Sequence, residues 1–454
     1  MKCKGYAYIY TIGCQMNIYD SEKLFVILEK IGYEKTEDLN QADIVICNTC
    51  SIREKAQEKA FSFLGRLADK KKKKPHLISI MAGCVAQQEK EQVFKRVPHL
   101  DVVLGTHAVA RLPEIIRAVQ SGKTHISETR ENHTIFETPP RIESNRVHKV
   151  SRFVTIMQGC DNYCTYCVVP YVRGRERSRT PESIVEEITI LAESGVKEVT
   201  LLGQNVNSYG QKEGICSFSQ LLAKINEIPG LERIRFATSH PKDLSDELIF
   251  AIRDFDKVCN QLHLPVQSGS NEILKKMHRG YTREIFLERI EMLRTHCPDV
   301  GLSSDMIVGF PSETRQDFEQ TLSLVSTVGF DGLFAFAYSD RPNAPAAKFS
   351  GAVDEVEKMA RLNALLALQE SFTEQKNNAL VGSVQSVLVE GESLKKRHAE
   401  PGENITAPQM TGRTDTGKIV HFSATGVVPG DMVNIKIAHA YSHSLWGTCA
   451  GELP

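Results

Sequence analysis

Three cysteines stand close together in the segment QGCDNYCTYC. Cys160, Cys164 and Cys167 are separated by three and then two residues. Three thiolates at this spacing can converge on one metal centre if the loop wraps around it. Structural zinc usually takes four protein ligands, and no fourth cysteine or histidine at suitable spacing follows nearby. A cubane iron–sulfur cluster held by three cysteines would instead leave one iron open to a small molecule.

Three further cysteines are related by their positions after predicted strands and not by their spacing in the sequence. Cys14, Cys50 and Cys84 each follow a short apolar segment that predicts a strand. The carboxyl ends of the strands in a doubly wound sheet share one edge, where ligands bind. We therefore expect these thiols to form a second three-thiolate site with one open iron. The alternative is three separate buried thiols, which is our interpretation of the scattered Cys3, Cys47, Cys216, Cys259, Cys297 and Cys449.

The predicted strands before Cys14, Cys50 and Cys84 belong to a segment, residues 1–122, in which strand and helix patterns alternate. The predicted strands are 6–12, 43–49, 76–83 and 101–105, and the predicted helices are 21–32, 53–70, about 88–97 and about 109–120. Right-handed crossovers between such strands give a parallel sheet covered on both faces. The pattern predicts a flavodoxin-like α/β domain. Residues 123–150 are polar, contain Pro139-Pro140, and predict a linker.

Cys160, Cys164 and Cys167 lie in a second alternating segment, residues 151–380. Six strands are predicted, at 152–158, 198–203, 233–238, 259–266, 301–310 and 332–338, and a long helix follows at about 354–380. Six βα units predict a partial barrel, and the cysteine loop then leaves its first strand at the mouth where active sites sit. Residues 381–447 lose the helical pattern. Short strands at 381–391, 417–424 and 430–440, with turns that contain glycine, predict a small antiparallel β-barrel there.

Composition limits the remaining possibilities. The 454 residues are 41% hydrophobic and 24% charged, the balance of a soluble globular protein. We find neither a secretory signal nor an apolar stretch long enough to span a membrane, so we expect a cytoplasmic protein with no membrane partner. Since the net charge is −1, RNA binding would have to use local patches.

The cysteine motifs and their surroundings resemble known families. The C-x-x-x-C-x-aromatic-C pattern, with Tyr166 as the aromatic residue, is similar to that of the radical S-adenosylmethionine (SAM) superfamily. Over essentially the full chain the sequence resembles the methylthiotransferases, and specifically the MiaB-type branch, the tRNA 2-methylthio-N6-dimethylallyladenosine synthases. The similar segments are TIGCQMN (11–17), NTCSIREKA (48–56), MAGCVAQ (81–87), VPYVRGRERSRTP (169–181), HLPVQSGS (263–270) and SSDMIVGFPSET (303–314). Ser312 and Asn343-Ala344 depart from the usual glycine and Gly-Thr.

The resemblance implies an enzyme with two 4Fe-4S clusters that uses SAM. One SAM molecule would methylate a sulfur of the auxiliary cluster held by Cys14, Cys50 and Cys84. A second, cleaved at the cluster held by Cys160, Cys164 and Cys167, would give the 5′-deoxyadenosyl radical. This radical would activate C2 of N6-dimethylallyladenosine next to the tRNA anticodon, and a methylthio group would then be inserted there. Both open irons would face one cavity between the first domain and the barrel mouth.

Candidate SAM or substrate contacts follow from the expected barrel mouth. They are Tyr166, Gly203, Gln204, Asn205, Ser239, His240, Gln267, Ser268 and Asp305. Each also has a structural interpretation, because asparagine and serine commonly cap helices or fix turns. The sequence assigns no general base among them.

RNA contacts are expected beside the cysteine loop. Arg173, Arg175, Arg177 and Arg179 follow it, and the planar guanidinium suits phosphate. A solvated basic loop is an equally good interpretation of these residues, and a solvated face is the better one for the lysine run at 70–74. The C-terminal β-barrel resembles a TRAM RNA-binding domain. The expected substrate is a tRNA anticodon stem-loop carrying N6-dimethylallyladenosine. The chemistry also implies a flavodoxin-like or ferredoxin-like electron donor and a supplier of sulfur or iron–sulfur units.

Two alternative functions remain open at this stage. The first is a non-catalytic RNA-binding or redox-sensing protein, whose cysteines hold zinc or form regulatory disulfides. The second is the same radical chemistry acting on a protein substrate.

Overall fold

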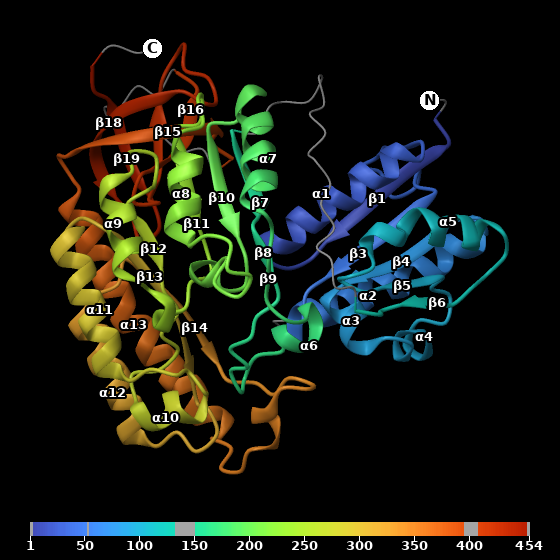
Figure 1. The fold of residues 1–454 in the computed structure, drawn as a ribbon, viewed down its shortest axis with the longest axis horizontal. Coiled ribbons are helices and arrows are strands. Elements are labelled where there is room, and N and C mark those ends of the chain that lie inside the picture. Colours follow the sequence, from blue (N-terminus) through green and yellow to red (C-terminus); the bar gives the residue numbers. More distant parts are fainter. Residues whose placement is uncertain (1–2, 52–53, 132–149, 395–406, 452–454) are drawn as a thin grey trace.

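Three folded units follow one another along the chain (Figure 1). The structure is a computed structural model, and it describes residues 3–51, 54–131, 150–394 and 407–451. Within these residues, every helix is too short or too polar to cross a membrane.

The first unit is a parallel sheet covered by helices on both faces. Its strands are β1 (Gly5–Thr11), β2 (Tyr33–Lys35), β3 (Ile44–Thr49), β4 (Ile78–Gly83), β5 (Val102–Leu104) and β6 (Ile126–Glu128), in the order β2-β1-β3-β4-β5-β6. Helices α1 (Gln15–Lys30) and α5 (Leu112–Gln120) pack on one face. Helices α2 (Glu54–Lys73), α3 (Cys84–Glu89) and α4 (Gln92–Arg96) pack on the other. The predicted flavodoxin-like α/β class is confirmed.

The sequence missed the two edge strands of this sheet. Strands β2 and β6 have three residues each, which is too short to show a periodic pattern. Strand β6 lies inside the segment expected to be a linker, residues 123–150, and it pairs with β5. Residues 132–149 of that segment lie outside the described residues. The helix expected near 88–97 is two short helices, because Lys90 takes a left-handed φ of 50° between them.

The second unit is an open barrel of six parallel strands. These are β7 (Ser151–Thr155), β10 (Glu198–Leu202), β11 (Arg233–Phe236), β12 (Gln261–His263), β13 (Gly301–Val308) and β14 (Gly332–Ala337). They form two three-stranded sheets, ordered β11-β10-β7 and β12-β13-β14, and a bridge between Ile234 and Val258 joins the two. The partial (βα)6 barrel is confirmed.

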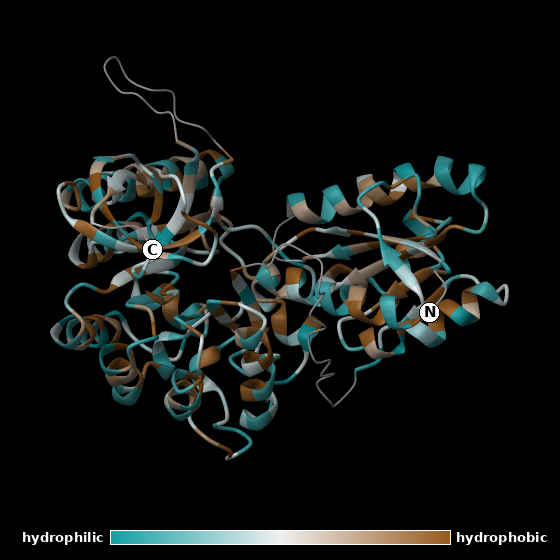
Figure 2. Ribbon diagram, turned by 90° about the horizontal axis from the view of Figure 1, so that it is seen from above, coloured by the Kyte–Doolittle hydropathy of each residue, from teal (hydrophilic) through white to brown (hydrophobic). Residues whose placement is uncertain are grey.

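The barrel helices bury one large apolar core against the outer face of these strands. They are α7 (Pro181–Glu193), α8 (Phe218–Asn226), α9 (Asp246–Asp254), α11 (Arg283–His296), α12 (Arg315–Val328) and α13 (Glu355–Ala379). Figure 2 shows their hydrophilic turns facing outward, with apolar stretches toward the sheets. The first crossover, from β7 to α7, contains β8 (Met157–Gln158), the cysteine loop, α6 (Val169–Arg173) and β9 (Arg177–Ser178).

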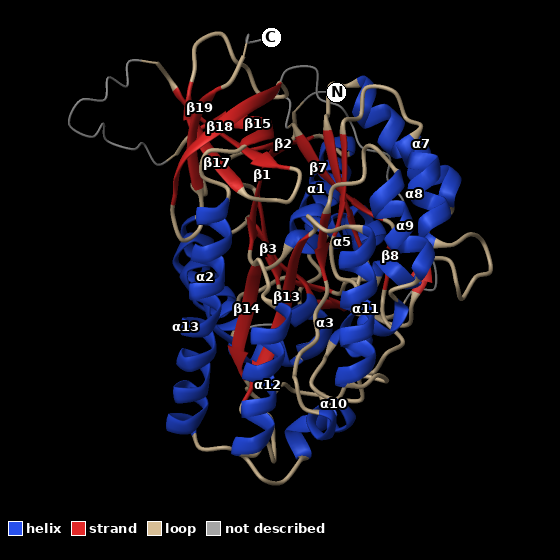
Figure 3. Ribbon diagram, turned by 90° about the vertical axis from the view of Figure 1, so that its left-hand side faces the viewer, coloured by secondary structure: helices blue, strands red, loops and turns tan. Residues whose placement is uncertain are grey.

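The third unit is a closed β-barrel. Its strands are β15 (Val384–Glu392), β16 (Gln409–Thr414), β17 (Ile419–Ser423), β18 (Met432–Ala440) and β19 (Leu445–Cys449), in the order β15-β16-β17-β19-β18. Figure 3 shows the strands gathered beyond the end of α13. The predicted small β-barrel is confirmed, but it is not antiparallel throughout, because β17 and β19 run parallel. The sequence had not predicted β16 and β19.

Two buried arginines attach this β-barrel to the amino ends of the parallel strands. Arg233, at the start of β11, donates to the carbonyl oxygens of Arg413 (2.6 Å) and Ser386 (3.0 Å). Arg235 donates to the carbonyl oxygens of Thr414 (2.7 Å) and Asp415 (2.9 Å) and pairs with Glu198 at 2.7 Å. The closed barrel therefore sits at the end of the parallel strands opposite the cysteine loop.

The substitution Arg235→Ala tests this attachment. It would leave the buried Glu198 without its ionic partner, and breaking a buried pair in this way costs about 3–5 kcal/mol. Unfolding in urea, followed by fluorescence of the single tryptophan, Trp446 on β19, measures the loss. Arg413→Ala is the matched control. It removes a half-exposed pair with Glu390 worth about 0–1 kcal/mol. Equal losses in the two variants would contradict the attachment.

Candidate functional site

The first trio of thiols lies at the carboxyl edge of the N-terminal sheet. Cys14 precedes α1, Cys50 follows β3, and Cys84 is the first residue of α3. Gly13 has a φ of +139°, and a Cβ there would lie 2.6 Å from the Cβ of Cys50. Gly83 has a φ of +91°, and a Cβ there would lie 2.5 Å from the carbonyl oxygen of Thr49. The two glycines let the cysteine-bearing turns approach the middle turn closely.

Buried side chains bind these three turns together. Asn17 donates to the Asn48 side chain (3.2 Å) and to the Thr49 carbonyl oxygen (2.9 Å). Asn48 donates back to the Asn17 carbonyl oxygen (2.9 Å), which joins the first turn to the second. The Thr49 hydroxyl donates to the Ala82 carbonyl oxygen (2.6 Å), which joins the second turn to the third. Asn17 of the Gln-Met-Asn motif and Asn48 of the Asn-Thr-Cys motif thus help to hold together the turns that carry the three cysteines.

A guanidinium from the second unit reaches this edge. Arg173, at the end of α6, is 5% exposed and pairs with Asp20 of α1 at 2.7 Å. A hydrogen bond from Cys50 lowers the pKa of the Cys14 thiol to about 6, against the effect of burial, and Arg173 contributes to the lowering. Burial raises the pKa of Cys84, although Arg173 partly opposes it. The trio is therefore close enough to share one positive charge.

The second trio is held by the loop between β8 and α6. The amide of Cys160 donates to the Gly174 carbonyl oxygen (3.2 Å), and that of Cys167 donates to the Cys164 carbonyl oxygen (3.0 Å). Thr165 donates to the carbonyl oxygens of Met277 through its amide (3.1 Å) and of Lys276 through its hydroxyl (2.8 Å). The loop is thus fixed against the end of α10 (Asn271–Lys276).

Arg279 is the residue beside this trio that the sequence did not single out. It is 4% exposed and donates to the Cys164 sulfur (3.4 Å), the Tyr166 hydroxyl (3.1 Å) and the Pro265 carbonyl oxygen (2.6 Å). One arginine more than 100 residues from the motif carries no spacing signal, so only the fold brings it here. Burial raises the pKa of Cys160 to about 11 and of Cys167 to about 12. Metal binding would have to displace protons from these two thiols.

The donor sets fit iron–sulfur clusters. All twelve cysteines are free, and within each trio the thiols lie close enough to affect one another's pKa values. Within the described residues, no three His, Cys, Asp or Glu side chains are grouped as ligands of a single metal ion. In a cluster each thiolate binds a different iron, so the three sulfurs lie farther apart than the ligands of a single metal ion.

Three predicted cofactor contacts have buried polar atoms with no hydrogen-bond partner among the residues that the structure describes. These atoms are the side-chain oxygens of Asn205 and Ser239 and Nε2 of His240, and each residue is at most 5% exposed. All three follow the carboxyl ends of β10 and β11. Burial, with Arg279 and Lys242, lowers the pKa of His240, so its ring is neutral. Buried polar atoms without partners are rare, and a polar ligand such as SAM fits them.

The other predicted contacts also lie at this end of the barrel but have roles within the protein. The Gln204 side chain accepts a hydrogen bond from the Gly159 amide (2.5 Å), and Gly203 accepts one from the Thr238 hydroxyl (2.8 Å). Asp305 lies 3.5 Å from Nε2 of His263. The remaining three are buried or partly buried: Tyr166 beside Arg279, Gln267 with a φ of 75°, and Ser268 against Thr321.

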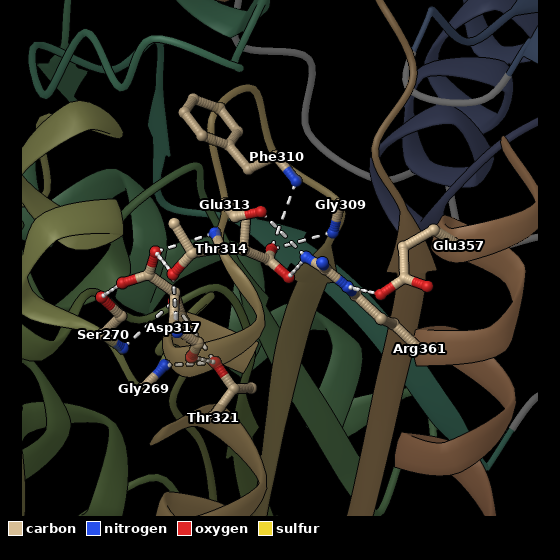
Figure 4. A network of polar contacts seen from close by, with 11 residues as sticks. Gly269, Ser270, Gly309, Phe310, Glu313, Thr314, Asp317, Thr321, Glu357 and Arg361 are labelled. Carbon is tan, nitrogen blue, oxygen red and sulfur yellow. Dashed lines mark hydrogen bonds and ion pairs between the residues drawn. The ribbon is translucent and has the colours of Figure 1, made fainter. Parts of the chain in front are cut away.

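The turn after β13 is fixed by a buried ion pair, shown in Figure 4. Glu313 accepts hydrogen bonds from the amides of Gly309 (2.8 Å) and Phe310 (3.3 Å). Arg361 of α13 pairs with Glu313 at 2.8 Å and with Glu357 at 2.9 Å. The Glu313 carboxylate, paired with Arg361 of α13, therefore fixes the Gly-Phe-Pro-Ser-Glu-Thr turn at the carboxyl end of β13.

The two cysteine-bearing regions face each other across the domain boundary. Met16 and Tyr19 of α1 pack with Leu202 at the end of β10. Cys84 packs with Val168 and Val172, which belong to the turn and helix directly after Cys167. The sheet edge with the first trio therefore lies over the barrel mouth, beside the loop that carries the second.

The four predicted RNA-binding arginines fall into two groups. Arg173 is buried against Asp20, and Arg179 is buried with Glu187 at 2.6 Å, so both act inside the protein and neither suits an RNA contact. Arg175 is exposed beside Asp161 (2.7 Å), and Arg177 lies partly exposed on β9. The lysine run also has protein partners, since Lys74 pairs with Asp43 at 2.7 Å and Lys71 pairs with Asp101.

Comparisons with protein families match all three units. The radical SAM superfamily matches residues 154–325, the uncharacterized protein family UPF0004 matches residues 6–105, and the TRAM domain matches residues 378–449. A tRNA-2-methylthio-N(6)-dimethylallyladenosine synthase of Desulfosudis oleivorans is 51% identical over 98% of this chain and 96% of its own length. Proteins of the same name from Syntrophus aciditrophicus and Geotalea uraniireducens are 49% and 48% identical, over 98% and 97% of this chain and 94% and 98% of their own lengths.

Solved structures share the fold at low identity. The radical SAM methyltransferase TsrM of Kitasatospora setae superposes with a TM-score of 0.57 at 14% identity, over 84% of this chain and 78% of its own. The cobalamin-dependent SAM radical enzyme OxsB superposes with a TM-score of 0.52 at 14% identity, over 82% of this chain and 56% of its own.

The unequal pKa values of the two trios predict unequal thiol reactivity in the metal-free chain. The thiolate is the nucleophile, so a Cys14 pKa of about 6 and a Cys160 pKa of about 11 make Cys14 the faster thiol at pH 7. Alkylation by iodoacetamide, followed by peptide mass spectrometry across pH, is expected to be at least about tenfold faster at Cys14. Arg173→Gln should move the Cys14 profile to higher pH, whereas Arg173→Lys should move it less. Identical profiles for Cys14 and Cys160 would contradict these electrostatics.

Proposed function

This chain belongs to the family of tRNA-2-methylthio-N(6)-dimethylallyladenosine synthases, and we propose that its two cysteine trios divide the family's reaction between them. The protein is a radical SAM methylthiotransferase. It inserts a methylthio group at C2 of N6-dimethylallyladenosine next to the tRNA anticodon. The observation that carries the proposal is the meeting of three distant turns, with Cys14, Cys50 and Cys84, over the loop that holds the other three cysteines.

Cys160, Cys164 and Cys167 hold the cluster at which SAM binds. When bound, the cluster and SAM supply the one-electron chemistry that an unactivated C–H bond requires. The chain's part is to hold the loop in place, through Thr165 against α10, and to set a guanidinium, Arg279, beside Cys164. That charge offsets part of the thiolates' negative charge in a buried site.

The SAM pocket lies at the carboxyl ends of β10, β11, β12 and β13. Its most direct contacts are Asn205, Ser239 and neutral His240, because within the described part of the chain their buried polar atoms have no hydrogen-bond partner. Nδ1 of neutral His240 accepts a hydrogen bond from the Lys242 amide (3.3 Å), so Nε2 carries the proton and can donate one hydrogen bond to SAM. The neutral ring does not repel the sulfonium of SAM. The pocket is completed by Tyr166, Gly203, Gln204, Gln267, Ser268 and Asp305.

Cys14, Cys50 and Cys84 hold the auxiliary cluster, which supplies the sulfur. The chain positions this site through the buried Asn17–Asn48 pair and keeps it beside the barrel through α6. Arg173 adds the charge that lets three thiolates lie together, and its bond to Asp20 fixes the guanidinium. The reacting base would be held between the two sites.

The RNA contacts are Arg175 and Arg177 beside the cysteine loop, together with the TRAM barrel at residues 381–447. The auxiliary domain extends past the expected boundary at residue 122 to include β6 (Ile126–Glu128), the rest of the segment expected as a linker at 123–150 follows, and the radical SAM core comprises 151–380. The protein works in the cytoplasm. Its reaction needs a flavodoxin-like or ferredoxin-like electron donor, and a supplier of sulfur or iron–sulfur units to restore the auxiliary cluster.

The division of labour predicts different losses in two variants. Cys160→Ala should abolish SAM cleavage, whereas Cys50→Ala should keep cleavage and stop methylthiolation of RNA. Each variant should hold about four of the roughly eight irons expected for two 4Fe-4S clusters. Iron content, 5′-deoxyadenosine release and nucleoside mass spectrometry after anaerobic reconstitution measure the three properties.

Cys216→Ala is the matched control, since this partly buried cysteine lies outside both trios, and it should keep all three properties. The substrate is tested by nucleoside analysis of bulk tRNA from a deletion strain, which should lack the methylthio group. A Cys50→Ala enzyme that methylthiolates RNA at the full rate would refute the proposal, and so would one or two zinc ions in place of iron.

A further inference from the structure

A cavity of about 620 Å³ lies beside the cysteine loop, outside both trios. Its walls come from the end of α3 and the turn that leads to α4, from the cysteine loop, from α6 and from Asn343. None of the six cysteines is among the described residues that line it. The volume falls within the range of about 300–1,000 Å³ that is typical of ligand pockets.

Two tyrosines form an aromatic wall of this cavity. Tyr163 and Tyr171 have ring centroids 6.2 Å apart at an interplanar angle of 79°. They are 38% and 40% exposed, which is high for large aromatic side chains at a domain boundary. Tyr163 takes a left-handed φ of 47°, a conformation that non-glycine residues adopt rarely and that fixes the ring beside the cavity. Exposed aromatic rings of this kind are stacking platforms for nucleobases.

Amide side chains supply hydrogen-bonding groups to the same cavity. Gln87 and Gln88 line it, and among the described residues neither side-chain oxygen has a hydrogen-bond partner. Gln87 is 4% exposed: its amide nitrogen donates to the Thr129 carbonyl oxygen (2.8 Å), and its oxygen packs against Gly105. Gln88 and Asn343 therefore remain as lining amides for a ligand. Amides of this kind can read the edges of an unstacked base.

The charges around the cavity favour a base over a phosphate chain or an acidic protein. Arg175 and Lys90 line it together with Glu89, Glu91 and Glu131, so no sign dominates. A site for a phosphate backbone or for an acidic electron donor would need an excess of positive charge. Aromatic faces and amides do not need such an excess.

We propose that this cavity binds an unstacked nucleotide that neighbours the modified adenosine in the anticodon loop. The proposal rests on the proposed function, since it takes the substrate to be tRNA. Tyr163 lies between Cys160 and Cys164 in the chain, so a nucleotide stacked there sits next to the place where the reacting base is presented. An enzyme that modifies a base in an RNA loop takes that base out of the stack, and the neighbouring loop bases can then stack on aromatic side chains.

The test measures binding of a synthetic anticodon stem-loop that carries N6-dimethylallyladenosine to the reconstituted full-length protein. Fluorescence anisotropy should show that Tyr171→Ala weakens binding by roughly 5- to 150-fold, the cost of losing one stacked base. Tyr171→Phe should restore the affinity, because the ring is kept. The slope of log K against log salt should stay unchanged in Tyr171→Ala, because no phosphate contact is lost.

Tyr6→Ala is the matched control, since Tyr6 is 39% exposed on β1 and lies away from the cysteine edge. It should bind the RNA with wild-type affinity. If Tyr171→Ala retains too little iron for binding assays, stem-loops with single 4-thiouridine substitutions should cross-link to Tyr163 or Tyr171 of the unaltered protein. Peptide mapping would show the site.

The outcomes separate this inference from the proposed function. If the wild type binds and methylthiolates the stem-loop while Tyr171→Ala binds it equally well, the nucleotide site is refuted and the function stands. Cross-links that fall only outside the cavity refute it in the same way. If Tyr171→Ala keeps its RNA affinity but accepts electrons from reduced flavodoxin more slowly, the cavity belongs to a protein donor. A wild-type protein that neither binds nor modifies the RNA refutes both.

Discussion

Keeping several thiolates together away from water is the requirement on which the rest of the structure depends. Like charges in a buried site repel, and the repulsion is screened poorly where the dielectric constant is low. The protein meets this requirement twice with a buried arginine brought from elsewhere in the chain. Arg173 reaches the N-terminal trio from the barrel domain, and Arg279 reaches Cys164 from the turn after α10. Since the charge for the first trio comes from the second domain, that site is electrostatically complete only when the two domains are docked.

The sequence predicted most of the fold because the signals were periodic or topological. Buried parallel strands gave apolar runs, and the shared edge of such strands led from Cys14, Cys50 and Cys84 to one expected site. Strands β2, β6, β16 and β19 escaped prediction because they are short or partly polar. The number of strands in each open sheet or closed barrel is decided by pairing between distant segments, which local patterns do not report.

The sequence was least informative about charged residues. Four arginines in seven positions look alike in the sequence, yet Arg173 and Arg179 are buried in ion pairs while Arg175 is exposed. Burial depends on what packs against a side chain, and here the partners Asp20 and Glu187 lie on other elements. The two departures from the family pattern show a similar limit. Ser312 and Asn343 take left-handed φ values of 64° and 70°, so each stands where the backbone itself favours the family's glycine.

The attachment of the TRAM barrel through Arg233 and Arg235 has a consequence for the length scale of the molecule. These arginines fix the small barrel to the amino ends of the parallel strands, whereas both trios lie at the carboxyl ends. The open barrel therefore sets a fixed distance between the TRAM barrel and the two cysteine sites. An RNA stem-loop that contacts the TRAM barrel and a cysteine site at the same time must span this distance, and a shorter one cannot reach both.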